Sequence, residues 1–203
     1  MTAKNALIVF AKPPIAGLAK TRLIPALGED GAAAYHKKLL HHTLKNVICE
    51  DKWDTHLWCS ENTKHDFFQF CEKEFSLVLQ QQIDGDLGSK MAHAIEQMLK
   101  DYEKVCIIGS DCPLINVQKI QDVFNCLQKN DDVVITPAED GGYVQLAVKR
   151  QLQPAIFAGI RWGGADVFQT TLHNISRLGL NPVIQSTLWD IDEPEDMIRF
   201  VEL

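Results

Sequence analysis

The fold of this chain can be inferred outward from one segment, Val105-Cys106-Ile107-Ile108-Gly109-Ser110-Asp111-Cys112-Pro113-Leu114. The first four residues favour a buried β-strand, and Pro113 interrupts strand pairing because it has no backbone N–H. Asp111 should therefore stand at the carboxyl edge of a central strand. Alternatively, Asp111 caps the turn that follows, which is a common role for an aspartate beside a proline.

Similar short runs of aliphatic or β-branched residues alternate along the chain with amphipathic helical patterns. Strands are predicted at residues 6–11, 56–59, 77–80, 105–109, 133–136, 143–148 and 183–186. Apolar residues at spacings of three and four predict helices within residues 35–48, 91–99, 117–127 and 168–178. A last helix is predicted from Pro194, with Asp192 as its N-cap.

This alternation predicts one α/β domain over residues 1–203, with a Rossmann-like three-layer α/β/α arrangement and a mostly parallel sheet. Ligands of such sheets bind in the crevice beyond the carboxyl ends of the strands. The residues that directly follow predicted strands are therefore the candidates for a functional site.

Composition excludes several classes of protein. The chain has 203 residues and a net charge of −7, and this acidic surplus argues against a nucleic-acid partner but not against a small anionic ligand. The apolar run at residues 6–11 is too short for a signal peptide or a membrane span. Six scattered cysteines without a CxxC pair favour reduced thiols over disulfides or a zinc site. These features predict a cytoplasmic protein without membrane contact.

A basic loop follows the first predicted strand and reads Lys12-Pro13-Pro14-Ile15-Ala16-Gly17-Leu18-Ala19-Lys20-Thr21-Arg22-Leu23. Glycine lets backbone N–H groups approach an anion, and lysine and arginine supply charge and donors for phosphate. The loop lacks the glycines of a Walker A motif and of a dinucleotide-binding motif. Its position favours phosphate binding over a solvated surface loop, with the candidates Lys12, Gly17, Lys20 and Arg22.

Carboxylates also stand at predicted strand ends. Asp111 alone suits Mg²⁺, which takes one or two protein carboxylates together with phosphate oxygens and water. Asp190 and Asp192 alternate along an extended segment, so they should point to opposite sides, and one of them could join Asp111 on a metal. Asp192 and Glu195 also fit a capping box, which needs no metal.

Two consecutive glycines open the strand predicted at residues 143–148. In Asp140-Gly141-Gly142 they would weaken strand pairing unless some group must approach the backbone closely. A bound acceptor whose hydroxyl reaches Asp140 would explain the pattern. An Asp-Gly turn that starts a hairpin explains it equally well.

Two other glycine-rich segments are weaker candidates. Gly85 and Gly88 lie with Lys90 at a strand–helix junction, which suggests a second ligand loop. Trp162 lies in a glycine-rich helix entry and could stack on a base or sugar, although such a tryptophan is more often packed in a core.

As a set, these segments resemble a bacterial transferase-like family over roughly residues 5 to 200; the matching segments are FAKPPIAGLAKTRL, GDLGSKM, GSDCPLI, EDGGYVQLAV, GIRWGGADV and DIDEPEDM. The family belongs to the nucleotide-diphospho-sugar transferase (GT-A) superfamily. Its members are often labelled glycosyltransferases, some in connection with arsenosugar biosynthesis. More distant relatives are molybdenum-cofactor nucleotidyltransferases and phospholactate guanylyltransferase. The resemblance implies the GT-A fold.

The resemblance also implies residue roles by position. The phosphate-gripping loop would consist of Lys12, Lys20 and Arg22. A Mg²⁺ or Mn²⁺ site would consist of Asp111, Asp190 and Asp192, which favours a metal role for Asp192 over a cap. The acceptor side would include Asp140, Gly141, Gly142 and Trp162. Related sequences have serine or threonine soon after the tryptophan, whereas Gly163-Gly164-Ala165 follows here, so no hydroxyl donor is expected at that place.

The implied activity is transfer from a nucleotide-activated donor to a small-molecule acceptor, with catalytic contributions from Lys20, Arg22 and Asp111. A nucleotidyltransferase would take a nucleoside triphosphate and release pyrophosphate. A glycosyltransferase would take a nucleotide-sugar and release a nucleoside diphosphate. Lys20 and Arg22 favour nucleotidyl transfer, because a leaving pyrophosphate needs cations. The family label favours glycosyl transfer, so both activities stay open. The alternative is a non-catalytic nucleotide-binding module, although binding alone would not require both Asp111 and Asp192.

Overall fold

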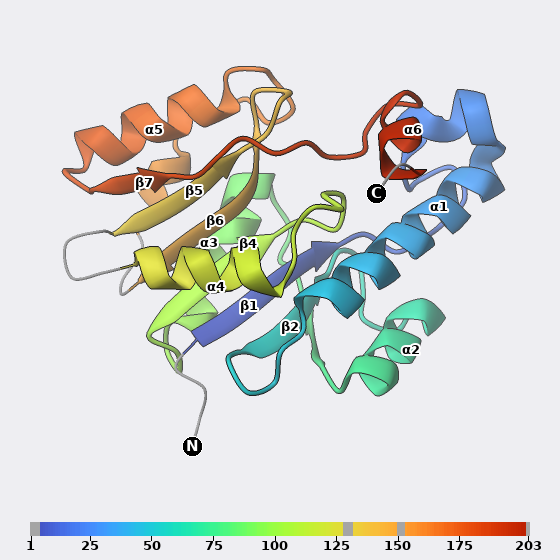
Figure 1. The fold of residues 1–203 in the computed structure, drawn as a ribbon, viewed down its shortest axis with the longest axis horizontal. Coiled ribbons are helices and arrows are strands. Elements are labelled where there is room, and N and C mark those ends of the chain that lie inside the picture. Colours follow the sequence, from blue (N-terminus) through green and yellow to red (C-terminus); the bar gives the residue numbers. More distant parts are fainter. Residues whose placement is uncertain (1–4, 128–131, 150–152, 202–203) are drawn as a thin grey trace.

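The computed structural model describes residues 5–127, 132–149 and 153–201, whose strands form one seven-stranded sheet (Figure 1). The strands are β1 (Asn5–Ala11), β2 (Asp54–Cys59), β3 (Val78–Gln81), β4 (Lys104–Ile108), β5 (Val133–Pro137), β6 (Tyr143–Lys149) and β7 (Pro182–Ile184). The helices are α1 (Ile24–Val47), α2 (Asp66–Phe75), α3 (Leu87–Met98), α4 (Val117–Cys126), α5 (Val167–Arg177) and α6 (Asp196–Val201), with 3-10 turns η1 (Thr21–Leu23) and η2 (Pro154–Phe157). All seven predicted strands are confirmed, and their ends shift by at most two residues.

The strand order is β3-β2-β1-β4-β6-β5-β7. Neighbouring strands are parallel except at β6, which runs antiparallel to β4 and to β5. The chain passes from β1 to β2 and β3 and then returns to place β4 on the other side of β1. A reversal of this kind opens a crevice at the carboxyl ends of the two central strands, which is where ligands of open α/β sheets bind.

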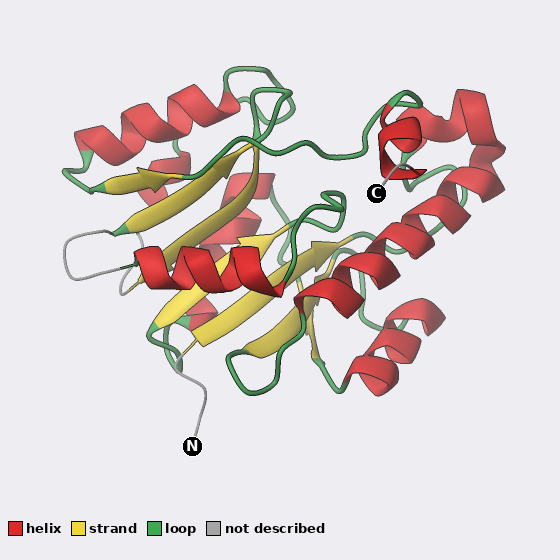
Figure 2. Cartoon of the chain, in the orientation of Figure 1, coloured by secondary structure: helices red, strands yellow, loops and turns green. Residues whose placement is uncertain are grey.

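Helices cover both faces of the sheet, so the predicted three-layer arrangement is confirmed (Figure 2). Leu7 and Val9 of β1 point into the core formed with α1, α2 and α4. Ala6 and Ile8 alternate with them and point into the second core, formed with α3, η2 and α5. A strand buried on both faces is continuously apolar, which explains why the run at residues 6–11 signals a strand so clearly.

Two helices differ from the sequence expectation. Helix α2 was not predicted, although Phe67, Phe68 and Cys71 form its buried side, because exposed Phe70 interrupts the apolar spacing of that side. Helix α1 starts well before the predicted segment. It is kinked at Gly28, where the φ of 71° is not helical.

Helix α6 begins at Asp196, two residues after the predicted start, and turn hydrogen bonds run into it from Glu193 and Pro194. The predicted cap, Asp192, directs its carboxylate to Lys20 and Arg22. Instead the carboxylate of Asp196 accepts hydrogen bonds from the backbone N–H groups of Asp192 (3.0 Å) and Glu193 (2.9 Å). The side chain of Asp192 is therefore available for other contacts.

The six cysteines are free thiols, as expected. Burial raises the pKa of the thiol groups of Cys59, Cys71, Cys106 and Cys112 to about 12, so these thiols stay protonated and behave as small apolar side chains. Within residues 5–127, 132–149 and 153–201, no helix combines the length and the apolar character needed to cross a bilayer.

Candidate active site

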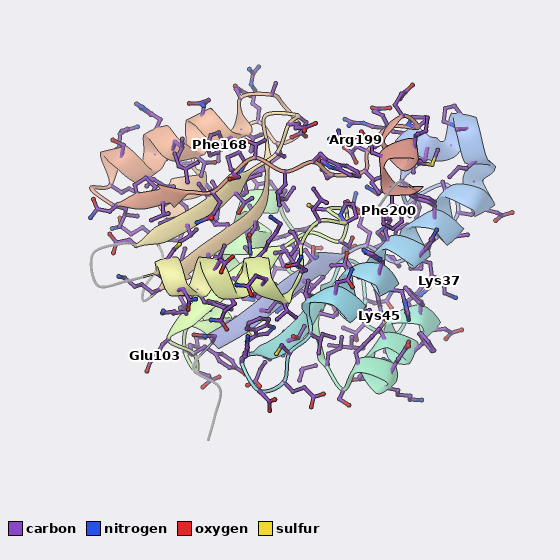
Figure 3. The ribbon with its side chains drawn as sticks, viewed as in Figure 1. Lys37, Lys45, Glu103, Phe168, Arg199 and Phe200 are labelled. Carbon is purple, nitrogen blue, oxygen red and sulfur yellow. The ribbon has the colours of Figure 1, made fainter. Side chains whose placement is uncertain are left out.

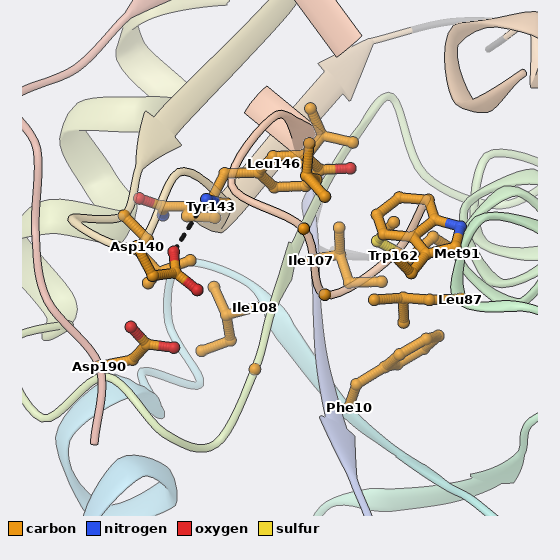
Figure 4. A pocket seen from close by; sticks show the side chains of 18 residues that line it. Phe10, Leu87, Met91, Ile107, Ile108, Asp140, Tyr143, Leu146, Trp162 and Asp190 are labelled. Carbon is orange, nitrogen blue, oxygen red and sulfur yellow. Dashed lines mark hydrogen bonds between the residues drawn. The ribbon is translucent and has the colours of Figure 1, made fainter. Parts of the chain in front are cut away.

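Two cavities open at the carboxyl ends of β1 and β4, and they share Phe10, Leu87 and Gly109 at their boundary. The larger, of about 490 Å³, is lined by four cationic side chains, Lys12, Lys20, Arg22 and Lys90. We call it the basic cavity. The smaller, of about 220 Å³, is lined mainly by apolar side chains and by Asp140 and Asp190. We call it the apolar cavity (Figure 4).

Lys20 is the centre of the charge network in the basic cavity. Its Nζ lies 3.0 Å from Asp111 Oδ2 and 3.2 Å from Asp192 Oδ1, and it also donates to the backbone carbonyl of Ile191. Only 6% of the Lys20 side chain is exposed, so all three donors of its ammonium group are used inside the protein. Burial acts to lower the pKa of Lys20, but Asp111 and Asp192 outweigh it, and the net pKa is raised.

Arg22 extends this network towards solvent. Its Nη1 lies 2.8 Å from Asp192 Oδ2, and its Nε lies 3.6 Å from Glu193. More than half of the Arg22 side chain is exposed, so most of its donors can still reach a ligand. The ammonium groups of Lys12 and Lys90 form no hydrogen bond or ion pair with the described residues, which leaves them available to an anion in the basic cavity.

Asp111 follows β4, as predicted, and is held from two sides. Ser110 beside it accepts a hydrogen bond from Thr43 of α1 (3.1 Å), which fixes the loop to that helix. Buried His36, also on α1, places Nδ1 at 3.9 Å from Asp111 Oδ1 and bonds through Nε2 to the carbonyl of Lys12 (3.0 Å). Burial would raise the pKa of Asp111, but Lys20 and then His36 outweigh it and lower that pKa.

Asp190 and Asp192 face different cavities, which agrees with the alternation expected from the sequence. Burial and the nearby carboxylates of Asp140, Asp192 and Asp111 raise the pKa of Asp190 to about 6, although Lys20 opposes them. Asp190 is therefore a half-buried acid crowded by other acids, an arrangement that a bound cation or a proton stabilises.

Backbone contacts hold the Asp190–Asp192 segment in place. The N–H of Ile191 donates to the carbonyl of Asp111 (2.9 Å), and Leu188 exchanges hydrogen bonds with Pro137 and Glu139 at the end of β5. Arg199 lies on α6, near the C-terminus (Figure 3). It forms a forked ion pair with Glu139 (2.9 and 3.2 Å) and stacks on Trp189 at 4.2 Å. These contacts bring Asp111, Asp190 and Asp192 together from distant parts of the chain.

The Asp140-Gly141-Gly142 segment is the turn of the β5–β6 hairpin, as one of the two sequence interpretations held. Asp140 Oδ1 accepts from the N–H of Gly142 (2.8 Å), so the carboxylate is fixed at the rim of the apolar cavity. The backbone of Gly141 is also closely approached, but by the backbone of Ala165 and not by a ligand. A Cβ on Gly141 would lie 2.1 Å from the carbonyl oxygen of Ala165.

Gly141→Ala should therefore lower the free energy of unfolding by about 3 kcal/mol, because the methyl group meets backbone that cannot move aside and the φ of 90° is unfavourable for alanine. Gly179→Ala is the matched control, since Gly179 also has a positive φ of 68° but nothing within 4 Å of a Cβ. It should cost about 1 kcal/mol. Urea unfolding of both variants measures the difference, and equal losses would contradict the close approach.

The remaining glycine candidates have structural contacts of their own. Gly17 turns the basic loop with a φ of 78°. Gly85, with a φ of 131°, precedes the cap of α3, where Asp86 accepts from the N–H of Ser89 (2.7 Å). Gly88 is buried, and a Cβ there would lie 2.9 Å from both Phe157 and Trp162. Contact of these glycines with phosphate stays a prediction.

Trp162 packs and also lines a cavity. Its ring lies 6.1 Å from that of Phe157 and 6.4 Å from that of Tyr143, and it forms part of the wall of the apolar cavity. Lys90, from the predicted second ligand loop, lines the basic cavity, whereas the lining residues His36 and Ser60 were not predicted. The glycine-rich segment around Lys90 gave a signal in the sequence, whereas an isolated histidine or serine gives none.

The predicted metal ligands do not form a ready-made site. Among the residues that the structure describes, no three His, Cys, Asp or Glu side chains are grouped so that they could hold a metal ion, and Lys20 lies between Asp111 and Asp192. The donor chemistry nevertheless fits Mg²⁺ or Mn²⁺, which prefer carboxylate oxygens and need few of them when phosphate supplies the rest. The raised pKa of Asp190 among three carboxylates fits a cation as well.

The fold is a Rossmann-like α/β fold with a mostly parallel sheet, and it matches that of nucleotide-diphospho-sugar transferases. A solved structure of a proposed nucleotide-diphospho-sugar transferase from Desulfovibrio desulfuricans G20 has a TM-score of 0.85 and 30% identity, over 95% of this chain and 84% of that one. Residues 43–164 match the family described as "Uncharacterized protein conserved in bacteria (DUF2064)", and the chain belongs to this family.

Relatives that carry the name 2-phospho-L-lactate guanylyltransferase are also found. The protein from Methanobrevibacter smithii is 25% identical over 181 residues, which are 88% of this chain and 76% of the relative. The protein from Methanothermobacter thermautotrophicus is 25% identical over 123 residues, 59% of this chain and 52% of the relative, so this match spans about half of that protein. The predicted family resemblance is confirmed, and the predicted class of enzyme, a transferase, agrees with these names.

Proposed function

We propose that this protein is a nucleotidyltransferase that binds a nucleoside triphosphate in the basic cavity and transfers the nucleotide to an acceptor in the apolar cavity. The observation that carries the proposal is the gathering of Lys12, Lys20, Arg22 and Lys90 around one cavity beside a set of aspartates. Lys12 and Lys90 lie in this cavity beside the ion-paired Lys20 and Arg22, and cations of this kind bind phosphate oxygens. The names of the guanylyltransferase relatives support the same chemistry.

The reaction is an in-line displacement at phosphorus. The acceptor's hydroxyl oxygen forms a bond to the α-phosphorus while the bond from that phosphorus to the bridging oxygen breaks, and pyrophosphate leaves with the electron pair. The hydroxyl proton passes to water or to a carboxylate. Arg22, Lys12 and Lys90 bind the phosphate oxygens, and Lys20 adds positive charge where the departing group becomes negative.

Divalent metal is part of the proposal. Asp111, Asp190 and Asp192 would hold Mg²⁺ or Mn²⁺, with phosphate oxygens as further ligands. The ion, when bound, neutralises charge on the phosphate groups. Asp192 would then exchange its contacts with Lys20 and Arg22 for the metal, and the released cations would bind the phosphates.

The test is the thermal stability of the purified protein with each nucleoside triphosphate, with and without Mg²⁺ or Mn²⁺. A ligand at about 100 times its Kd should add about 2.7 kcal/mol of stability. Asp111→Asn should remove the metal-dependent part of this gain, whereas Asp30→Asn, at an exposed position of α1, should keep it. If no triphosphate stabilises the wild-type protein under any of these conditions, the proposal is wrong.

Glycosyl transfer is the second candidate, because the Desulfovibrio desulfuricans protein carries a nucleotide-diphospho-sugar transferase name. The same measurement separates the two activities. Stabilisation by a nucleotide-sugar but not by the corresponding triphosphate would favour attack at the sugar carbon with release of a nucleoside diphosphate.

A further inference from the structure

The two cavities differ sharply in charge, although they meet at Phe10, Leu87 and Gly109. Cationic side chains line the basic cavity. In contrast, no lysine, arginine or histidine is found among the described residues that line the apolar cavity. A ligand that enters the apolar cavity therefore meets no side chain able to neutralise a phosphate or carboxylate group.

The apolar cavity has a polar end and an apolar end (Figure 4). Asp140 and Asp190 both line this cavity and lie at the same end of it. Leu87, Met91 and Trp162 gather at the other end. A molecule with one hydroxyl group and an apolar body matches this division, because carboxylates accept hydrogen bonds from a hydroxyl and the wall excludes water from the body.

An anionic group would be disfavoured at either end. At the polar end it would face the carboxylates of Asp140 and Asp190, and Asp140, which is not among the proposed metal ligands, would keep its negative charge when a metal ion is bound. At the apolar end it would lose its hydration without gaining a partner. The cations that could bind an anion lie in the neighbouring basic cavity, which the triphosphate is proposed to fill.

We infer that the acceptor of this enzyme is an uncharged alcohol with an apolar body, bound in the apolar cavity with its hydroxyl at Asp140 and Asp190. This inference rests on the proposed function, because the bound alcohol is an acceptor only if the protein transfers a nucleotide to it. The inferred acceptor is uncharged, and it therefore differs from 2-phospho-L-lactate, the phosphorylated acid in the name of the guanylyltransferase relatives. Specificity would arise from the absence of a cation as much as from the apolar wall.

The test compares two probes that share one body, 3-phenyl-1-propanol and 3-phenylpropyl phosphate, by calorimetric titration of the full chain. Titrations are made without nucleotide and with Mg²⁺ and a triphosphate whose α–β bridge is a methylene group. The alcohol should bind at least about tenfold more tightly than its phosphate in both conditions, a preference of about 1.4 kcal/mol. Equal binding, tighter binding of the phosphate, or binding of neither probe overturns the inference.

Variants locate the preference in the apolar cavity. Asp140→Asn keeps an oxygen for the N–H of Gly142 but removes a negative charge. It should therefore reduce the preference for the alcohol over its phosphate several-fold. The control variant Asp30→Asn should leave this preference unchanged. Met91→Lys introduces a cation and should reverse the preference; circular dichroism checks that it folds. If Asp140→Asn and a folded Met91→Lys both keep the wild-type preference, the probes bind elsewhere and the inference is wrong.

The two proposals fail in different ways. If the triphosphate analogue binds but the phosphate probe is preferred, nucleotide binding stands and the inference about the acceptor is wrong. If no nucleotide binds, the proposed function fails, while the titrations without nucleotide still show whether the apolar cavity prefers the alcohol.

Discussion

Lys20→Met is expected to weaken triphosphate binding by about 30- to 100-fold and to lower the free energy of unfolding by about 2 kcal/mol. The binding loss follows from removing a buried charge-assisted donor, a change worth about 2–3 kcal/mol. The stability loss follows because Asp111 and Asp192 lose the cation that joins them at 3.0 and 3.2 Å. It is smaller than for a fully buried pair because 35% of the Asp111 side chain and 41% of the Asp192 side chain are exposed to solvent.

The matched control is Lys45→Met, because Lys45 is an exposed lysine on α1, far along the helix from the basic cavity (Figure 3). It should leave both quantities within the error of measurement. Calorimetric titration gives the affinity, and urea unfolding gives the stability. If Lys20→Met binds triphosphate as tightly as the wild-type protein, Lys20 is a structural cation that only holds the aspartates together, and its proposed role towards phosphate is wrong.

Asp190→Asn is expected to make the protein more stable above pH 6 while removing metal-dependent binding of the triphosphate. The folded pKa of about 6 lies above the ordinary 3.8, so the folded state holds the proton more tightly than the unfolded state. Stability from this group is therefore complete below about pH 4 and is lost as pH rises through about 6. The shift corresponds to at most about 3 kcal/mol, and partial solvent contact reduces the expected gain to about 1–2 kcal/mol.

Urea unfolding of Asp190→Asn and wild-type protein at pH 4, 6 and 8, in buffer with a chelator, tests this expectation. The two proteins should be equally stable at pH 4, and the variant should be more stable at pH 8. Asp30→Asn serves as the control and should show no such pH-dependent difference. A variant that is less stable than the wild-type protein at pH 8 would mean that Asp190 makes a favourable contact rather than suffering repulsion. Gain of stability with loss of ligand binding is typical of functional sites.

The fold was predictable because each strand has a local signature. The runs at 6–11 and 105–109 are apolar and bounded by polar or breaking residues, and both became central strands. Helix α2 was missed because the exposed Phe70 interrupts its apolar spacing, and the start of α1 was missed because Gly28 interrupts the helical pattern. The antiparallel direction of β6 depends on a tight β5–β6 turn, and the sequence allowed both that turn and a ligand loop at Asp140-Gly141-Gly142.

The candidate site was predictable in position but not in its contacts. Sequence alone determined that Lys20, Asp111 and Asp192 each follow a strand or a strand-like segment, since parallel strands place such residues at one edge of the sheet. Only the tertiary structure decided that Lys20 joins the two aspartates and that Asp190 faces an apolar cavity without a cation. Lys20 and Asp192 are 172 positions apart, and a contact across such a separation depends on how the intervening elements pack. Local patterns report the chemistry of each segment, whereas the charge balance of a cavity is a sum over segments that only packing brings together.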